Sequence, residues 1–276
     1  MSQPIVVEFV GMMGSGKSTI TRLVLDELNR RGYQCPSQKK IVSWMAKSGF
    51  NNLPVSLGIL QKLCYYSKFS YLISALQFPL VAFKAYHFAL SVSPQNRNSW
   101  QASRSSMNWM GIFNKYIRNS PYDAVVLEEG AIQYTLQIPL FGEQYSDNAQ
   151  KQLISSLLTN QNHLVVFLKI DAETAMKRIQ GRAAASHQQG MLAWQFENET
   201  EDEQMRRASQ AVNLFESLVK PLRELSPRSL IEVDTLKDPQ ENAALVVDSI
   251  ERLVTEIESA EGTNLLNTFK LYFQGI

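Results

Sequence analysis

The chain has 276 residues, of which 45% are hydrophobic, and this is enough to build the core of an ordinary globular protein. The formal net charge of +1 provides no general attraction to nucleic acid or an anionic membrane, so any phosphate binding must be local and no nucleic-acid partner is expected. Cys35 and Cys64 form no C-x-x-C pair. The first residues show no export signal, and a cytoplasmic location is expected.

The first predicted elements are a buried strand over residues 4–10 and a helix that begins near Ser18. The loop between them reads Gly11-Met12-Met13-Gly14-Ser15-Gly16-Lys17-Ser18, followed by Thr19 at the helix start. It fits the G-x-x-x-x-G-K-[ST] pattern of a phosphate-binding loop in full, in the required strand-loop-helix context. Its glycines let backbone N–H groups converge on phosphate oxygens, towards which the helix dipole also points. We expect Lys17 to reach the β- and γ-phosphates of ATP and Ser18 to bind Mg²⁺.

Alternating strands and helices follow. Apolar runs predict strands over 123–130, 163–171 and 229–234, with a weaker one near 33–36, and amphipathic patterns predict helices over 147–159, 172–184, 201–225 and 242–257. This alternation predicts an α/β fold, with a parallel sheet covered by helices on both faces. Right-handed crossovers then place the carboxyl ends of the strands, with Gly11, Glu128, Asp171 and Asp234, along one edge near the nucleotide.

Four segments together resemble the thymidylate-kinase-like branch of the P-loop kinases. They are the loop at 11–18, the strand that ends at Glu128, the segment 168–182 and the segment 231–242. The resemblance implies a P-loop three-layer sandwich, ATP and Mg²⁺ as ligands, and a mobile lid whose R-x-x-x-R arginines cover the phosphates. Arg178 and Arg182 have that spacing, and Arg206 and Arg207 are further lid-flanking candidates. Arginine suits this role because its planar fork binds phosphate oxygens in pairs.

Two acids end the strand over 123–130. In the resembling family this position carries an acid followed by arginine, where the acid positions Mg²⁺ or accepts the acceptor's proton. Glu128 keeps the acid, but Glu129 replaces the arginine. This change disfavours a nucleoside monophosphate as acceptor and favours a neutral or cationic compound with a hydroxyl group. The alternative for Glu129 is an acid at a helix start that faces solvent.

Residues 40–119 are predicted to form a helical insertion on the acceptor side. Within it, residues 53–92 favour two helices broken at Pro79. A membrane span is disfavoured because Gln77, Lys84 and His87 are costly in a bilayer, whereas a peripheral membrane face or a groove for an apolar acceptor stays open. The three histidines show no metal spacing. The candidate acceptor contacts are Tyr65, Tyr66, Tyr86, Arg97, Trp100, Arg104, Asn108 and Trp109.

Together these patterns predict one kinase domain over residues 1–265, with a lid over about 178–200. The tail at 266–276 resembles part of a protease-recognition tag and is set aside. The predicted function is ATP-dependent transfer of a phosphoryl group to the hydroxyl of a small molecule. Its catalytic residues would be Lys17, Glu128, Arg178 and Arg182, with Ser18 and Glu128 at the metal. The alternatives are a nucleoside or nucleoside-monophosphate kinase and a regulatory ATPase.

Overall fold

A computed structural model describes most of the strands and helices predicted above. It describes residues 4–37, 40–41, 75–76, 78–92, 100–107, 109, 117, 120–141, 146–158, 162–186, 200–225 and 227–273. Side chains are described in these ranges except at 141, 182–186, 227, 258 and 260–273. Of the two helices predicted within 53–92, most of the one before Pro79 lies outside the described residues, as does most of the predicted lid.

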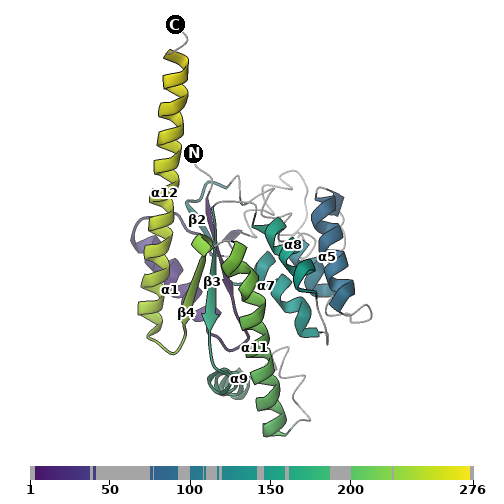
Figure 1. Ribbon diagram of the computed structural model, residues 1–276. Coiled ribbons are helices and arrows are strands. Elements are labelled where there is room, and N and C mark those ends of the chain that lie inside the picture. The colour runs from purple at the N-terminus through teal and green to yellow at the C-terminus, as the bar shows by residue number, and fades with distance from the viewer. Residues whose placement is uncertain are drawn as a thin grey trace, which may run out of the picture.

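The centre of the fold is a four-stranded parallel sheet. Its strands are β1 (Ile5–Val10), β2 (Ala124–Leu127), β3 (His163–Lys169) and β4 (Leu230–Asp234), in the order β2-β1-β3-β4. β1 pairs with β2 on one side and β3 on the other, so all carboxyl ends lie at one edge of the sheet. The predicted α/β fold, a parallel sheet flanked by helices, is confirmed (Figure 1).

The strand predicted near 33–36 is wrong. This segment lies beside β2, where the carbonyl of Gln34 accepts a hydrogen bond from the N–H of Asp123 at 3.1 Å. The N–H of Gln34, however, donates to the side-chain oxygen Oδ2 of Asp123 at 2.7 Å. Because a side chain takes the hydrogen bond that a neighbouring strand would take, the segment runs along the sheet without joining its ladder.

Helices cover both faces of the sheet. One face carries α1 (Lys17–Arg30) and α12 (Pro239–Phe273), and the other carries α5, α7, α8, α9 and α11 (Figure 1). Side chains of β1 alternate between the faces, so that Ile5, Val7 and Phe9 pack with the first pair of helices. In the described part of the chain, the helices on the second face include α5 (Pro79–Val92), α7 (Ala131–Gln137), α8 (Asp147–Leu157), α9 (Ala172–Ser186) and α11 (Glu201–Leu225), with short 3-10 turns at Ile138–Phe141 and Pro227–Ser229.

α5 begins at Pro79, where a proline is tolerated because the first helical N–H groups need no partner within the helix. One face of α5 is buried and includes Ala85, Phe88 and Ala89, whereas Leu80 and Phe83 on the opposite face are exposed. No helix within the described part of the chain is long and apolar enough to cross a membrane.

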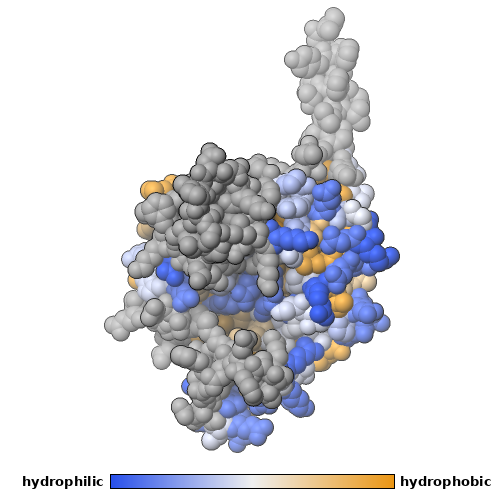
Figure 2. Space-filling view, turned by 180° about the vertical axis from the view of Figure 1, so that it is seen from behind, coloured by the Kyte–Doolittle hydropathy of each residue, from blue (hydrophilic) through white to orange (hydrophobic). Residues whose placement is uncertain are grey.

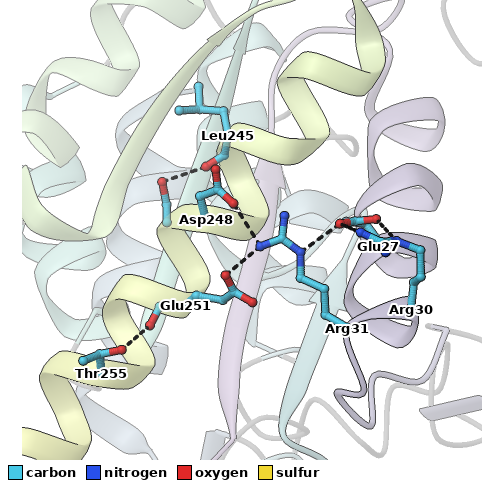
Figure 3. A network of polar contacts seen from close by, with 8 residues as sticks. Glu27, Arg30, Arg31, Leu245, Asp248, Glu251 and Thr255 are labelled. Carbon is cyan, nitrogen blue, oxygen red and sulfur yellow. Dashed lines mark hydrogen bonds and ion pairs between the residues drawn. The ribbon is translucent and has the colours of Figure 1, made fainter.

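Charged side chains join α1 to α12 (Figure 3). The guanidinium of Arg31, just after α1, lies 2.8 Å from Glu27 of α1 and 3.0 and 2.6 Å from Asp248 and Glu251 of α12. Hydrogen bonds from Arg30 and Arg31 lower the pKa of Glu27 to about 2. Below the grey projecting end of the molecule, the coloured surface is mainly hydrophilic, with hydrophobic patches between the hydrophilic ones (Figure 2). The network therefore fastens the first helix of the fold to the last at the surface, above the apolar contacts between them.

Candidate functional site

The phosphate-binding loop connects β1 to α1, as its sequence predicts. Gly14 has φ +85°, and a Cβ atom there would lie 2.7 Å from the carbonyl oxygen of Ala175, so a side chain at this position has neither the conformation nor the space. Gly16 precedes α1, and the first turn of α1 contains no acidic side chain. The N–H groups at the start of α1 therefore present an uncancelled partial positive charge beside the loop.

Lys17 lies along its own loop. Its Nζ donates to the carbonyl oxygen of Gly11 at 2.7 Å and to that of Met12 at 3.1 Å. The side chain is half-buried, whereas Ser18 and Thr19 after it are exposed. The lysine side chain thus folds back over the loop that would hold the phosphates, and its charged Nζ lies beside Gly11 and Met12.

Glu128 and Ser18 lie in contact, although 110 residues separate them in the sequence. Ser18 Oγ donates to Glu128 Oε1, which brings the residue after β2 to the first turn of α1. A carboxylate and a hydroxyl are hard oxygen donors of the kind that Mg²⁺ prefers, and a Mg²⁺ bound with a nucleotide takes few ligands from the protein. The two residues fit such an ion. In the part of the chain that the structure describes, no three His, Cys, Asp or Glu side chains form a separate metal cluster.

Glu129 faces Tyr134 of α7. The hydroxyl group of Tyr134 donates to Glu129 Oε2 at 3.0 Å, and the Glu129 side chain is half-buried. The acid is therefore held in place by an aromatic residue, unlike an acid that simply extends into solvent from a helix start. Whether it faces an acceptor stays a prediction.

Arg178 of α9 reaches the phosphate loop. Its Nη1 donates to the Gly14 carbonyl at 3.4 Å, and its Nη2 donates to the Thr235 carbonyl at 2.9 Å. Arg182 lies one turn further along α9, and its side chain is outside the described residues. Arg206 and Arg207 are exposed on α11. Among the predicted lid arginines whose side chains the structure describes, Arg178 is the one that reaches the loop.

Asp171 places α9 at this edge. Its Oδ1 accepts the N–H of Thr174 at 2.8 Å, which is the bond of a helix-capping carboxylate. This backbone hydrogen bond, and a second one from the Thr174 side chain, lower the pKa of Asp171 below its ordinary value. Asp171 therefore has a structural role in fixing the start of the helix that carries Arg178.

The sequence analysis did not identify Gln133, which bonds to the loop backbone, or Glu8, which bonds to Gln133. The side-chain amide of Gln133 accepts the N–H of Gly11 at 2.9 Å and donates to the carbonyl of Gly11 at 3.2 Å. Glu8 is 1% exposed in β1, and its Oε1 accepts the N–H of Gln133 at 2.7 Å. His163 Nε2 lies 3.3 Å from the other carboxylate oxygen of Glu8. A glutamate in an otherwise apolar strand was a signal for Glu8, because a buried carboxylate needs partners.

Four of the eight residues predicted to contact the acceptor are described, namely Tyr86, Trp100, Arg104 and Trp109. Tyr86 of α5 packs on Trp100, with ring centroids 4.8 Å apart. Trp109 is 3% exposed and belongs to the core, with Ile117 and Val125. Arg104 is half-buried. Tyr65, Tyr66, Arg97 and Asn108 lie outside the described residues.

Comparisons with known proteins give little beyond this geometry. No protein-family profile and no curated protein matches the sequence. Deoxyadenosine kinase from M. mycoides with bound dATP aligns with 90% of this chain and 99% of its own, at a TM-score of 0.45 and 12% sequence identity. The structure of that kinase with bound dCTP aligns with 92% of this chain and 100% of its own, at a TM-score of 0.35 and 13% identity. Similarity at this level decides neither the branch nor the ligand.

Proposed function

We propose that the chain is an ATP-dependent phosphotransferase that moves the γ-phosphoryl group to a hydroxyl of a small molecule. The observation that carries this proposal is the contact between Ser18 and Glu128, which joins a complete phosphate loop to a carboxylate at the carboxyl edge of the sheet. Phosphoryl transfer needs this combination, because its catalysis is mainly positioning and neutralisation of charge.

The proposal assigns a role to each residue of the site. The loop N–H groups and Lys17 bind the phosphates, and the Lys17 ammonium, which has three N–H donors, starts from its bonds to the carbonyls of Gly11 and Met12. Ser18 and Glu128 hold Mg²⁺, which when bound neutralises the phosphate oxygens, and Glu128 orients the acceptor hydroxyl or takes its proton. Arg178 adds positive charge above the loop, and Arg182 is expected to do the same from the lid.

Glu129 bears on the acceptor. A carboxylate held by Tyr134 next to Glu128 places a second negative charge at this end of β2. Two acids repel an acceptor that already carries a phosphate, and they favour one that offers hydroxyl or amine hydrogens. Nucleosides are the first acceptors to test, since they carry a primary hydroxyl and no phosphate.

The test is ATP turnover by the full-length chain with a panel of nucleosides, nucleoside monophosphates, sugars and amino alcohols. We expect transfer to at least one acceptor without phosphate. Efficient use of a nucleoside monophosphate, with kcat/KM above about 10⁴ M⁻¹s⁻¹, would contradict our interpretation of Glu129. ATP hydrolysis that no acceptor accelerates would instead favour a regulatory ATPase. In the variant Glu129→Arg, we expect activity to shift towards phosphorylated acceptors.

A further inference from the structure

Glu8 is a buried carboxylate in a strand whose other residues are apolar. It is 1% exposed, and the rest of β1 is buried with it. Burial of a carboxylate costs free energy unless hydrogen-bond donors replace the water that it loses. The N–H of Gln133 donates to Glu8 Oε1 at 2.7 Å, and His163 Nε2 lies 3.3 Å from Oε2. Groups from α7 and β3 thus hold this carboxylate in one orientation.

The carboxylate of Glu8 takes the place of a capping side chain at the start of α7. The residue before this helix is Gly130, which has no side chain to serve as a cap. Glu8 instead accepts the N–H of Gln133, the third residue of α7, which is an N–H that a capping side chain commonly takes. A Cβ atom on Gly130 would lie 2.6 Å from Cδ of Glu8 and 2.7 Å from its Oε2. The glycine therefore makes room for a cap that comes from β1.

The residue that Glu8 caps is also the one that bonds to the phosphate loop. Gln133 Oε1 accepts the N–H of Gly11 at 2.9 Å, and its Nε2 donates to the carbonyl of Gly11 at 3.2 Å. The same carbonyl accepts Nζ of Lys17 at 2.7 Å, so the orientation of Gly11 affects where the ammonium group lies. One continuous set of hydrogen bonds thus runs from Glu8 through Gln133 to the first residue of the loop.

A cap from the neighbouring strand does more than satisfy an N–H. A serine or aspartate at position 130 would accept the same N–H at a smaller cost of burial, but it would not attach α7 to β1. From this geometry we infer that Glu8 is a positioning residue for the nucleotide, which holds the start of α7 on β1 so that Gln133 fixes Gly11. The inference rests on the proposed function, because it concerns the same nucleotide site.

A double-mutant cycle on the full-length chain tests this inference, with the Kd of ATP measured by calorimetry. Glu8→Leu removes the acceptor of the Gln133 N–H, and we expect the Kd to rise about tenfold, because small displacements of groups that hold a ligand are costly. In the Gln133→Met background the bonds to Gly11 are already lost, so adding Glu8→Leu is expected to change the Kd by less than about twofold. Equal rises in the two backgrounds, or no rise in either, would overturn the inference.

Two conservative variants separate the hydrogen bond from the charge. Glu8→Gln keeps an oxygen that can accept the N–H of Gln133, so we expect a Kd within about twofold of the wild type, even if the melting temperature changes. Glu8→Asp keeps the charge but is one methylene group shorter, so it withdraws the carboxylate from α7 and should raise the Kd. It replaces Glu8→Leu in the cycle if the leucine variant fails to fold. A raised Kd in Glu8→Gln with an unchanged Kd in Glu8→Asp would contradict the inference.

Ser146 provides a matched control for the loss of a helix cap. Its side chain accepts the N–H of Ala149 at 3.3 Å at the start of α8, on the same face of the sheet as α7. Ser146→Ala is expected to lower the melting temperature without changing the Kd of ATP. A Kd that rises as much in Ser146→Ala as in Glu8→Leu would make the effect a general loss of stability and would overturn the positioning role.

Calorimetry measures ATP binding alone, so it separates this inference from the proposed reaction. A wild-type chain that binds ATP but phosphorylates no acceptor would overturn phosphotransfer, and the cycle would still decide the role of Glu8. A wild-type chain that binds no ATP would overturn both.

Discussion

At the scale of single residues, the site depends on contacts between side chains and loop backbone. Lys17, Gln133 and Arg178 all bond to main-chain atoms of the phosphate loop, whereas Glu128 bonds to a side chain at the start of α1. Substitution of Gln133 should act on loop geometry and substitution of Lys17 on nucleotide binding, whereas substitutions of Arg178 and Glu128 should act on the reaction.

Glu128→Gln separates these two effects. The amide keeps the size of the side chain but removes its charge and its basicity, so we expect kcat to fall by about a hundredfold or more. Stability should hardly change, because Glu128 is only partly buried. The measurement is steady-state turnover with the best acceptor, with Glu173→Gln on the exposed face of α9 as control. A wild-type kcat in Glu128→Gln would remove Glu128 from the reaction.

Arg178→Ala tests the arginine that reaches the loop. It loses the bonds to Gly14 and Thr235 as well as a charge next to the phosphates, and we expect kcat to fall by about a hundredfold. Arg178→Lys should recover little, because one ammonium group cannot replace a planar fork that spans two carbonyls. Unchanged kcat with a lower melting temperature would show a purely structural arginine. The same assay on Arg182→Ala tests its expected role in the lid.

At the scale of elements, the charged network between α1 and α12 holds the helix behind the phosphate loop. Arg31 contacts three carboxylates and is the centre of this network. Arg31→Ala should lower the melting temperature at low salt, and the loss should shrink at roughly 0.5 M salt, where surface charges are screened. Lys151→Ala, which breaks a single exposed pair with Glu224, is the control and should have the smaller effect. Equal effects in the two variants would contradict a cooperative network.

The same network gives stability a dependence on pH. Hydrogen bonds from Arg30 and Arg31 lower the pKa of Glu27 to about 2. The charged form of this carboxylate is therefore more stable in the folded chain than in the unfolded chain. A lowered pKa contributes stability above the ordinary value of about 4.3, and this contribution is lost as the pH falls towards 2. Melting curves between these two pH values should therefore show a steeper decline for the wild type than for Glu27→Gln. Parallel declines would contradict the lowered pKa.

At the scale of the whole molecule, sequence patterns predict the strands and most helices, because apolar periodicity is a local signal. The helix over 201–225 begins and ends where the sequence predicts, and the four described strands agree within a few residues. α7 was not predicted, since its seven residues are too few to show a helical period. The strand near 33–36 failed because an aspartate side chain 89 residues away takes its N–H.

The sequence predicts the parts of the site that lie in one contiguous motif, but it does not predict contacts between residues of different elements. The phosphate loop is one run of sequence, and the acid at 128 follows from the parallel order of the strands. The hydrogen bonds between Gln133 and Gly11 join residues from different elements, and no local sequence pattern predicts them. Glu129 was identified as unusual, but the bond to Tyr134 needed the fold.

We expect the packing of α1 against α12 to affect the order in which the chain folds during synthesis. β1 lies between partners that begin at residues 124 and 163, and α1 packs its apolar side chains against α12, which begins at Pro239. The phosphate loop is thus among the first segments to be synthesised, but the helix that follows it gains its contacts with α12 only near the end of synthesis. A chain stopped before Pro239 should expose Val24 and Leu28 of α1 and should gain no thermal protection from ATP. Restoring the missing residues as a separate peptide should return that protection.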